Sequence, residues 1–139
     1  RYQYGRYPRV DAWNIHNYLL EPEQAPWSLE VFQRRILTFR EWMARVGEGD
    51  KPLILSEFGV LQRALPDGAP VPPERVIAFM QESVRWMASS GAVQGWAWFA
   101  TSSGGLFGGE LTDAHDALTP YGEAYRALVQ ELAPEGAAP

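Results

Sequence analysis

The stretch Lys51-Pro52-Leu53-Ile54-Leu55-Ser56-Glu57-Phe58-Gly59 sets the expectations for the fold. Its continuous apolar run, Leu53 to Leu55, is typical of a strand in a parallel sheet that is covered on both faces. Lys51-Pro52 opens this strand, and Ser56 and Glu57 close it. We therefore predict a strand over residues 52–57 that ends in an acidic side chain.

A helix pattern lies on each side of this strand. Before it, apolar residues recur at spacings of three and four from a plausible N-cap, Ser28, until Gly47 interrupts them. After it, residues 62–73 are rich in Pro and Gly and indicate a loop, and a second run of apolar residues at helical spacing follows. The pattern predicts helices over 28–46 and 73–90.

One more strand is predicted on each side of these helices, over 10–16 and 93–99. Thr119-Pro120 then supplies an N-cap and a proline at the first helical position, which predicts a last helix over 119–132. Strand and helix thus alternate three times. Such alternation indicates an α/β protein with parallel strands joined by right-handed crossovers.

Two architectures accommodate three such units: a small doubly wound domain, or the C-terminal portion of a TIM (β/α)8 barrel. A three-stranded parallel sheet has two open edges and needs cover on both faces. We therefore expect it to be completed by the N-terminal half of the same barrel or by a homo-oligomer partner. The domain should span residues 10–133, after a lead-in over 1–9 and before a frayed tail over 134–139.

Composition excludes several classes of function. The 139 residues are 46% hydrophobic and 21% charged, as in ordinary globular proteins. The formal net charge of −5 argues against a nucleic-acid partner, and no apolar run approaches the roughly 18 residues of a membrane span. Without cysteine there is no disulfide or thiolate chemistry. The chain begins at Arg1 with no visible signal peptide, which suggests a processed or truncated product; the compartment stays open, with secretion among the options.

All three predicted strands end in polar or aromatic side chains. They are His16 with its neighbours, Glu57, and Trp98 with Phe99. The C-terminal ends of barrel strands meet at one face, where active sites are built, so these side chains should converge. Taken singly, each has an ordinary alternative: a glutamate that reaches solvent, a hydrogen-bonded structural histidine, or a core tryptophan. The high aromatic content, 13%, fits either a filled core or a sugar site.

Together, these strand ends resemble strands six to eight of the large clan of retaining (β/α)8-barrel glycoside hydrolases, which includes cellulases, mannanases and β-glycosidases. The motifs that carry the resemblance are Val10-Asp11-Ala12-Trp13-Asn14-Ile15-His16-Asn17-Tyr18, Lys51-Pro52-Leu53-Ile54-Leu55-Ser56-Glu57-Phe58-Gly59 and Gly95-Trp96-Ala97-Trp98-Phe99. The segment Leu118-Thr119-Pro120-Tyr121-Gly122 is similar to the usual entry to the eighth helix. The Ser-Glu-Phe-Gly strand end is the most specific part.

The resemblance implies a role for each strand end. Glu57 corresponds to the catalytic nucleophile that forms a covalent glycosyl-enzyme intermediate. His16 and Tyr18 correspond to residues near that nucleophile and can donate hydrogen bonds to it. Trp98 corresponds best to the ring under the bound sugar, with Trp96 as the weaker alternative. The implied function is retaining hydrolysis of O-glycosidic bonds in a carbohydrate substrate.

The second carboxyl group of such an enzyme is not evident. The clan places its acid/base Glu at the end of strand four, usually after an Asn, but the only asparagines here, Asn14 and Asn17, do not precede a Glu. We expect this acid in a missing N-terminal part, and Glu110 is the nearest candidate within the chain. A non-catalytic carbohydrate-binding or pseudo-enzyme module is the alternative function. The chemistry requires no metal and no organic cofactor.

Overall fold

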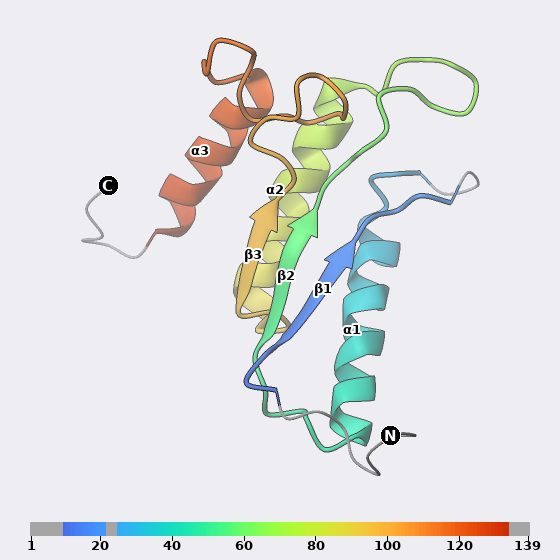
Figure 1. Cartoon of the computed structure of the whole chain (residues 1–139), viewed down its shortest axis with the longest axis vertical. Coiled ribbons are helices and arrows are strands. Elements are labelled where there is room, and N and C mark those ends of the chain that lie inside the picture. The colour runs from blue at the N-terminus through green and yellow to red at the C-terminus, as the bar shows by residue number, and fades with distance from the viewer. Residues whose placement is uncertain (1–9, 22–24, 134–139) are drawn as a thin grey trace.

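The computed structural model describes residues 10–21 and 25–133, in which three strands and three helices alternate along the chain (Figure 1). The elements are β1 (Trp13–Asn17), α1 (Leu29–Arg45), β2 (Leu53–Phe58), α2 (Pro73–Ser90), β3 (Gly95–Trp98) and α3 (Pro120–Leu132). The α/β class and all six predicted elements are confirmed. β1 and β3 are shorter than predicted. Their pairing with the central strand β2 begins only at Trp13, opposite Leu53, and at Gly95, opposite Ile54. The predicted lead-in and tail lie outside the described residues.

Local sequence signals account for the helix ends. The side chain of Ser28 accepts a hydrogen bond from the backbone N–H of Val31, and that of Thr119 accepts one from Gly122. α3 begins with Pro120, whose missing N–H costs nothing at this position. α2 ends at Gly91, which adopts the left-handed conformation with a φ of 66°. Both predicted N-caps are thus confirmed.

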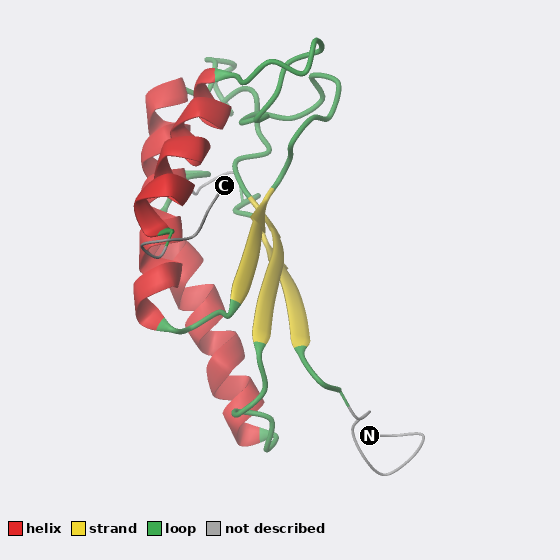
Figure 2. Ribbon diagram, turned by 90° about the vertical axis from the view of Figure 1, so that its left-hand side faces the viewer, coloured by secondary structure: helices red, strands yellow, loops and turns green. Residues whose placement is uncertain are grey.

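The strands form one parallel sheet in the order β1-β2-β3. All three helices lie on the same side of this sheet, α3 packed against α2, and the opposite face, called here the open face, has no cover from the described residues (Figure 2). In β2, Leu53 and Leu55 are buried on the helix side and Ile54 is only half-buried. The described residues therefore cover this strand on one face only. The described residues do not form a doubly wound domain by themselves, because that fold has helices on both faces of its sheet.

The hydrophobic core lies between the sheet and the helices. Phe32 of α1 is fully buried, and its ring lies 5.6 Å from that of Phe58 and 5.4 Å from that of Phe79, between ring centroids. On the outside, Arg85 of α2 makes two hydrogen bonds, of 2.9 and 2.7 Å, to the carboxylate of Glu131 on α3. None of the described helices is long and apolar enough to cross a bilayer.

A β-bulge interrupts β2 just before its end. On one side, Ile15 pairs with Leu55 and His16 pairs with Glu57, so that Ser56 is passed over. On the other side, the register moves by two residues in β3 while β2 advances by three. Side chains of a regular strand alternate between its faces, so Leu53, Leu55 and residue 57 would all face the helices. The extra residue reverses the alternation, places buried Phe58 on the helix side and turns Glu57 to the open face.

Candidate active site

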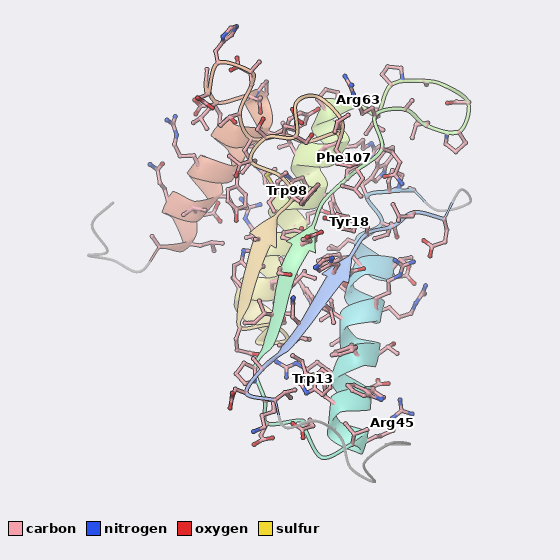
Figure 3. The ribbon with its side chains drawn as sticks, in the orientation of Figure 1. Trp13, Tyr18, Arg45, Arg63, Trp98 and Phe107 are labelled. Atoms are coloured by element: carbon pink, nitrogen blue, oxygen red, sulfur yellow. The ribbon has the colours of Figure 1, made fainter. Side chains whose placement is uncertain are left out.

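The C-terminal ends of the three strands form the candidate site. Figure 3 shows Tyr18 beside the tip of β2, with Phe107 and Arg63 on the loops at the same end of the sheet and Trp13 and Arg45 at the opposite end. Glu57 stands on the open face with 35% of its side chain exposed, next to His16, whose side chain is 50% exposed. The structure therefore brings together Glu57, His16 and Tyr18, three of the residues that the sequence singled out.

Two side chains approach the same oxygen of Glu57. Tyr18 donates its hydroxyl to Oε2 at 2.9 Å, and Nδ1 of His16 lies 3.2 Å from Oε2. No described residue hydrogen-bonds Oε1. Burial, followed by the hydrogen bond to Glu57, raises the pKa of Tyr18 well above its ordinary value. Tyr18 therefore keeps its proton and remains a hydrogen-bond donor to Glu57.

Two hydrogen bonds with α1 fix the end of β1. Arg35 of α1 donates a hydrogen bond of 2.6 Å to the carbonyl of Tyr18 and also pairs with Glu21. Asn17 is buried and donates from Nδ2 to the carbonyl of Phe32 at 3.0 Å. Because Asn17 points to the helices, His16 before it and Tyr18 after it point to the open face. Sequence reasoning missed Arg35, since an arginine on an amphipathic helix carries no signal of this role.

The two tryptophans of β3 lie on the wrong face for the role that the resemblance implied. Trp98 is 5% exposed, its ring centroid is 5.2 Å from that of Phe58 and 6.4 Å from that of Phe79 on α2, and its Nε1 donates to the carbonyl of Gly109 at 2.8 Å. Trp96 pairs with Leu55 and packs against the core. Both side chains face the helices, so the expectation that they share a cleft with Glu57 is not met.

Phe99 is the aromatic residue that reaches the open face instead. It follows Trp98 and therefore points the other way, and its ring lies edge-on to Tyr18 with 6.0 Å between centroids. Gly59 allows β2 to approach this point: a Cβ there would lie 2.7 Å from the carbonyl oxygen of Phe99. The Ser-Glu-Phe-Gly motif thus ends in glycine because a side chain at this position would collide with the backbone of Phe99. The alternation of side chains along the strand could have indicated Phe99, but the two tryptophans at positions 96 and 98 gave a stronger pattern.

Glu110 is engaged by hydrogen bonds within its own loop. Its Oε1 accepts hydrogen bonds from the backbone N–H of Ser103 at 2.8 Å and of Gly105 at 3.0 Å, and from the Ser103 hydroxyl. These bonds, the hydroxyl of Ser103 first, lower the pKa of Glu110. Within the described ranges, no three His, Cys, Asp or Glu side chains are grouped to hold a metal ion.

Comparison with known proteins identifies relatives of this arrangement. Residues 4–125 match the sequence profile of a family described as glycosyl hydrolase catalytic core. No curated protein matches the chain significantly in sequence. Among solved structures, a family 128 (subgroup I) endo-β-1,3-glucanase from Amycolatopsis mediterranei, crystallised with laminaritriose, is similar with a TM-score of 0.58 and 20% identity, over 86% of this chain and 46% of that one.

A second similar structure is the subgroup II endo-β-1,3-glucanase of the same family from Sorangium cellulosum, with a TM-score of 0.54 and 20% identity over 93% of this chain and 43% of that one. At this level of identity the similarity concerns the fold. The chain spans slightly less than half the length of the solved structures that it resembles.

Proposed function

Because the chain belongs to the glycosyl hydrolase catalytic core family, we propose that it forms part of a retaining glycoside hydrolase with Glu57 as the nucleophile. The observation that carries this proposal is the asymmetry at the Glu57 carboxylate. His16 and Tyr18 both approach Oε2, at 3.2 and 2.9 Å, and leave Oε1 without a partner among the described residues. A nucleophilic carboxylate needs this arrangement, with one oxygen oriented by donors and the other directed at substrate.

The proposed reaction follows the general scheme of retaining glycosidases. Oε1 of Glu57 attacks the anomeric carbon, and the bond from that carbon to the leaving oxygen breaks as a second carboxylic acid protonates this oxygen. Water then releases the sugar from Glu57 with the second group acting as base. We place that acid/base on another part of the same barrel, with its carboxyl group about 5–5.5 Å from Glu57. His16 and Tyr18 hold the nucleophile in place throughout.

We also propose that residues 10–133 are three βα units of a (β/α)8 barrel. The sheet is parallel, its helices cover only one face, and both β1 and β3 are edge strands of the described sheet. Apolar side chains are exposed on the outer helices, Leu37 on α1 and Val129 and Leu132 on α3. Further βα units would cover these flanks and the open face. A homo-oligomer partner is the other way to cover them.

The substrate proposal rests on the neighbours. Both solved structures named above are endo-β-1,3-glucanases, and one holds laminaritriose. We propose a β-1,3-linked glucan as the first substrate to test. One observation favours the alternative of a carbohydrate-binding module without catalysis: Glu21 and Glu110, two acidic residues on loops, are engaged with Arg35 and with Ser103. The presence of an acid/base residue elsewhere in the full protein would favour the hydrolase, and its absence would favour the binding module.

Replacing Tyr18 by Phe should lower kcat by about 10- to 100-fold, because a hydrogen bond to a charged group contributes about 1.5–3 kcal/mol. KM should change little, since Tyr18 orients Glu57 rather than binding substrate. A second readout needs no substrate. Because the pKa of Tyr18 is raised, the ultraviolet titration of the wild type and of Tyr18→Phe should show the same tyrosinate absorbance at pH 10–11. A difference of one tyrosinate there would contradict the hydrogen bond.

The chain on its own should be neither a stable monomer nor an active enzyme. Exposed apolar surface costs about 25 cal/mol per Å², and the stability of a whole domain is only about 5–15 kcal/mol. Analytical ultracentrifugation should therefore find self-association or aggregation of residues 1–139. Unactivated β-1,3-glucan oligosaccharides should not be cleaved, because protonation of the leaving group contributes about 10²–10⁴-fold in rate. A stable, active monomer would overturn both the barrel proposal and the placement of the acid.

A further inference from the structure

The loop that follows β3 owes its backbone path to its glycines. The glycine loop, residues 101–110, has Gly104, Gly105 and Gly109 at φ values of 68°, 78° and 74°, which a residue with a side chain rarely adopts. Its base is closed by two backbone hydrogen bonds, from Leu111 to Ala100 at 3.1 Å and from the next residue to Thr101 at 2.8 Å. The loop is therefore a compact unit with a defined path.

Glu110 holds this path from inside. Its carboxylate accepts hydrogen bonds from the backbone N–H groups of Ser103 and Gly105 and from the hydroxyl of Ser103. These bonds tie the first half of the loop to Glu110, its last residue. The hydroxyl of Ser103 in turn accepts the backbone N–H of Phe107 at 3.2 Å. One carboxylate thus links the start of the loop to the residue at its tip.

Anchors from two other elements hold the loop from outside. Arg63, on the loop after β2, donates to the carbonyl of Gly105, and the backbone N–H of Gly108 donates to the carbonyl of Leu61 at 3.2 Å. A Cβ on Gly108 would lie 2.8 Å from the carbonyl oxygen of Gln62, so only glycine permits this approach. From below, buried Trp98 donates to the carbonyl of Gly109. The loop is therefore packed onto the strand ends and onto its neighbour.

This packing places Phe107 against the candidate site. Its ring centroid lies 5.6 Å from that of Phe99, which itself lies 6.0 Å from that of Tyr18, the donor to Glu57 (Figure 3). Phe107 is 36% exposed. The rings of Tyr18, Phe99 and Phe107 therefore form a row that leads from Glu57 to the loop. Exposed aromatic surface of this kind packs against the C–H faces of sugars.

We infer that Glu110 is a positioning residue of the glycosidase site: it folds the glycine loop so that Phe107 meets Phe99 beside Tyr18 and Glu57. The inference rests on the proposed function and assigns Glu110 a structural task within it. The competing assignment is the acid/base group. An acid/base group must carry a proton near the working pH, whereas the donors around Glu110 favour the ionised form and lower its pKa.

The test compares Glu110→Ala with Glu110→Gln in the active protein, with laminarin oligosaccharides and an activated aryl glycoside as probes. Glu110→Ala frees the loop, so KM for the oligosaccharides should rise at least about tenfold through the cost of ordering it on binding, while kcat stays within about threefold. Glu110→Gln keeps an oxygen acceptor and should recover much of the loss. The pH profile of kcat should keep its shape in both variants.

A second readout is independent of catalysis. The indole N–H of Trp98 is bonded to Gly109, so its hydrogen exchange, followed by NMR, should be faster in Glu110→Ala and close to wild type in Glu110→Gln. A loss of about 10²–10⁴-fold in kcat on oligosaccharides with the aryl glycoside spared would identify Glu110 as the acid and overturn the inference. Unchanged KM and exchange would overturn it too. Failure of the proposed function is a separate result, since it would be seen in labelling of Glu57.

Discussion

Replacing Glu57 by Gln should lower kcat by at least about 10³-fold on any glycoside that the active protein cleaves, because no covalent intermediate can form. The fold should be unaffected. The Glu57 side chain is 35% exposed on the open face, and Gln has nearly the same shape. The thermal midpoint should therefore stay within a few degrees of the wild type, and circular dichroism checks this directly.

A matched control and a chemical label sharpen this test. Glu82→Gln makes the same change on the exposed side of α2 and should leave turnover unchanged. A 2-deoxy-2-fluoro glycoside with a good leaving group should add its mass to the peptide that contains Glu57, because the trapped intermediate is an ester of the nucleophile. Activity of Glu57→Gln near that of the wild type, or a label on another peptide, would refute the assignment of the nucleophile.

Replacing Trp98 by Ala should reduce the free energy of unfolding by about 3–5 kcal/mol, the usual cost of removing a large core aromatic. Trp98 is 5% exposed, packs against Phe58 and Phe79, and uses its indole N–H to bind Gly109. Against a total stability of about 5–15 kcal/mol, this loss should be evident in a urea unfolding curve of the active protein.

Phe99→Ala is the matched control for Trp98→Ala. Phe99 is only half-buried and sits on the open face beside Tyr18. Its loss should cost clearly less stability than the loss of Trp98, and should weaken oligosaccharide binding in a calorimetric titration. The reverse outcome, a stable Trp98→Ala that has lost binding, would restore Trp98 as the sugar platform that the sequence suggested.

The helices could be located from the sequence because the spacing of apolar residues agreed with the residues that mark helix ends. The helical spacing of apolar residues, with Ser28 and Thr119 as caps and Gly91 at a helix end, located α1, α2 and α3 to within one residue at each end. The convergence of Glu57, His16 and Tyr18 also followed, because residues at the C-terminal ends of parallel strands must be neighbours.

The rest depended on contacts that leave no trace in a local pattern. Whether Trp98 or Phe99 lies on the open face beside Glu57 depends on the pairing register of β3, and a shift of one residue exchanges the two faces. The task of Glu110 depends on three donors supplied by the fold of one loop. Glycine content indicated that a loop was there, but not which carboxylate would organise it.

The bulge in β2 has a consequence for how this protein can change during evolution. Ser56 is the residue that both ladders pass over, so the faces of its neighbours do not depend on its side chain. Deletion of this one codon would leave Glu57 directly after Leu55, and the regular alternation would still place Glu57 on the open face and Phe58 on the helix side. Alignments of relatives should accordingly show both varied residues and one-residue gaps at this column, with Leu55 and Glu57 unaffected on either side of it.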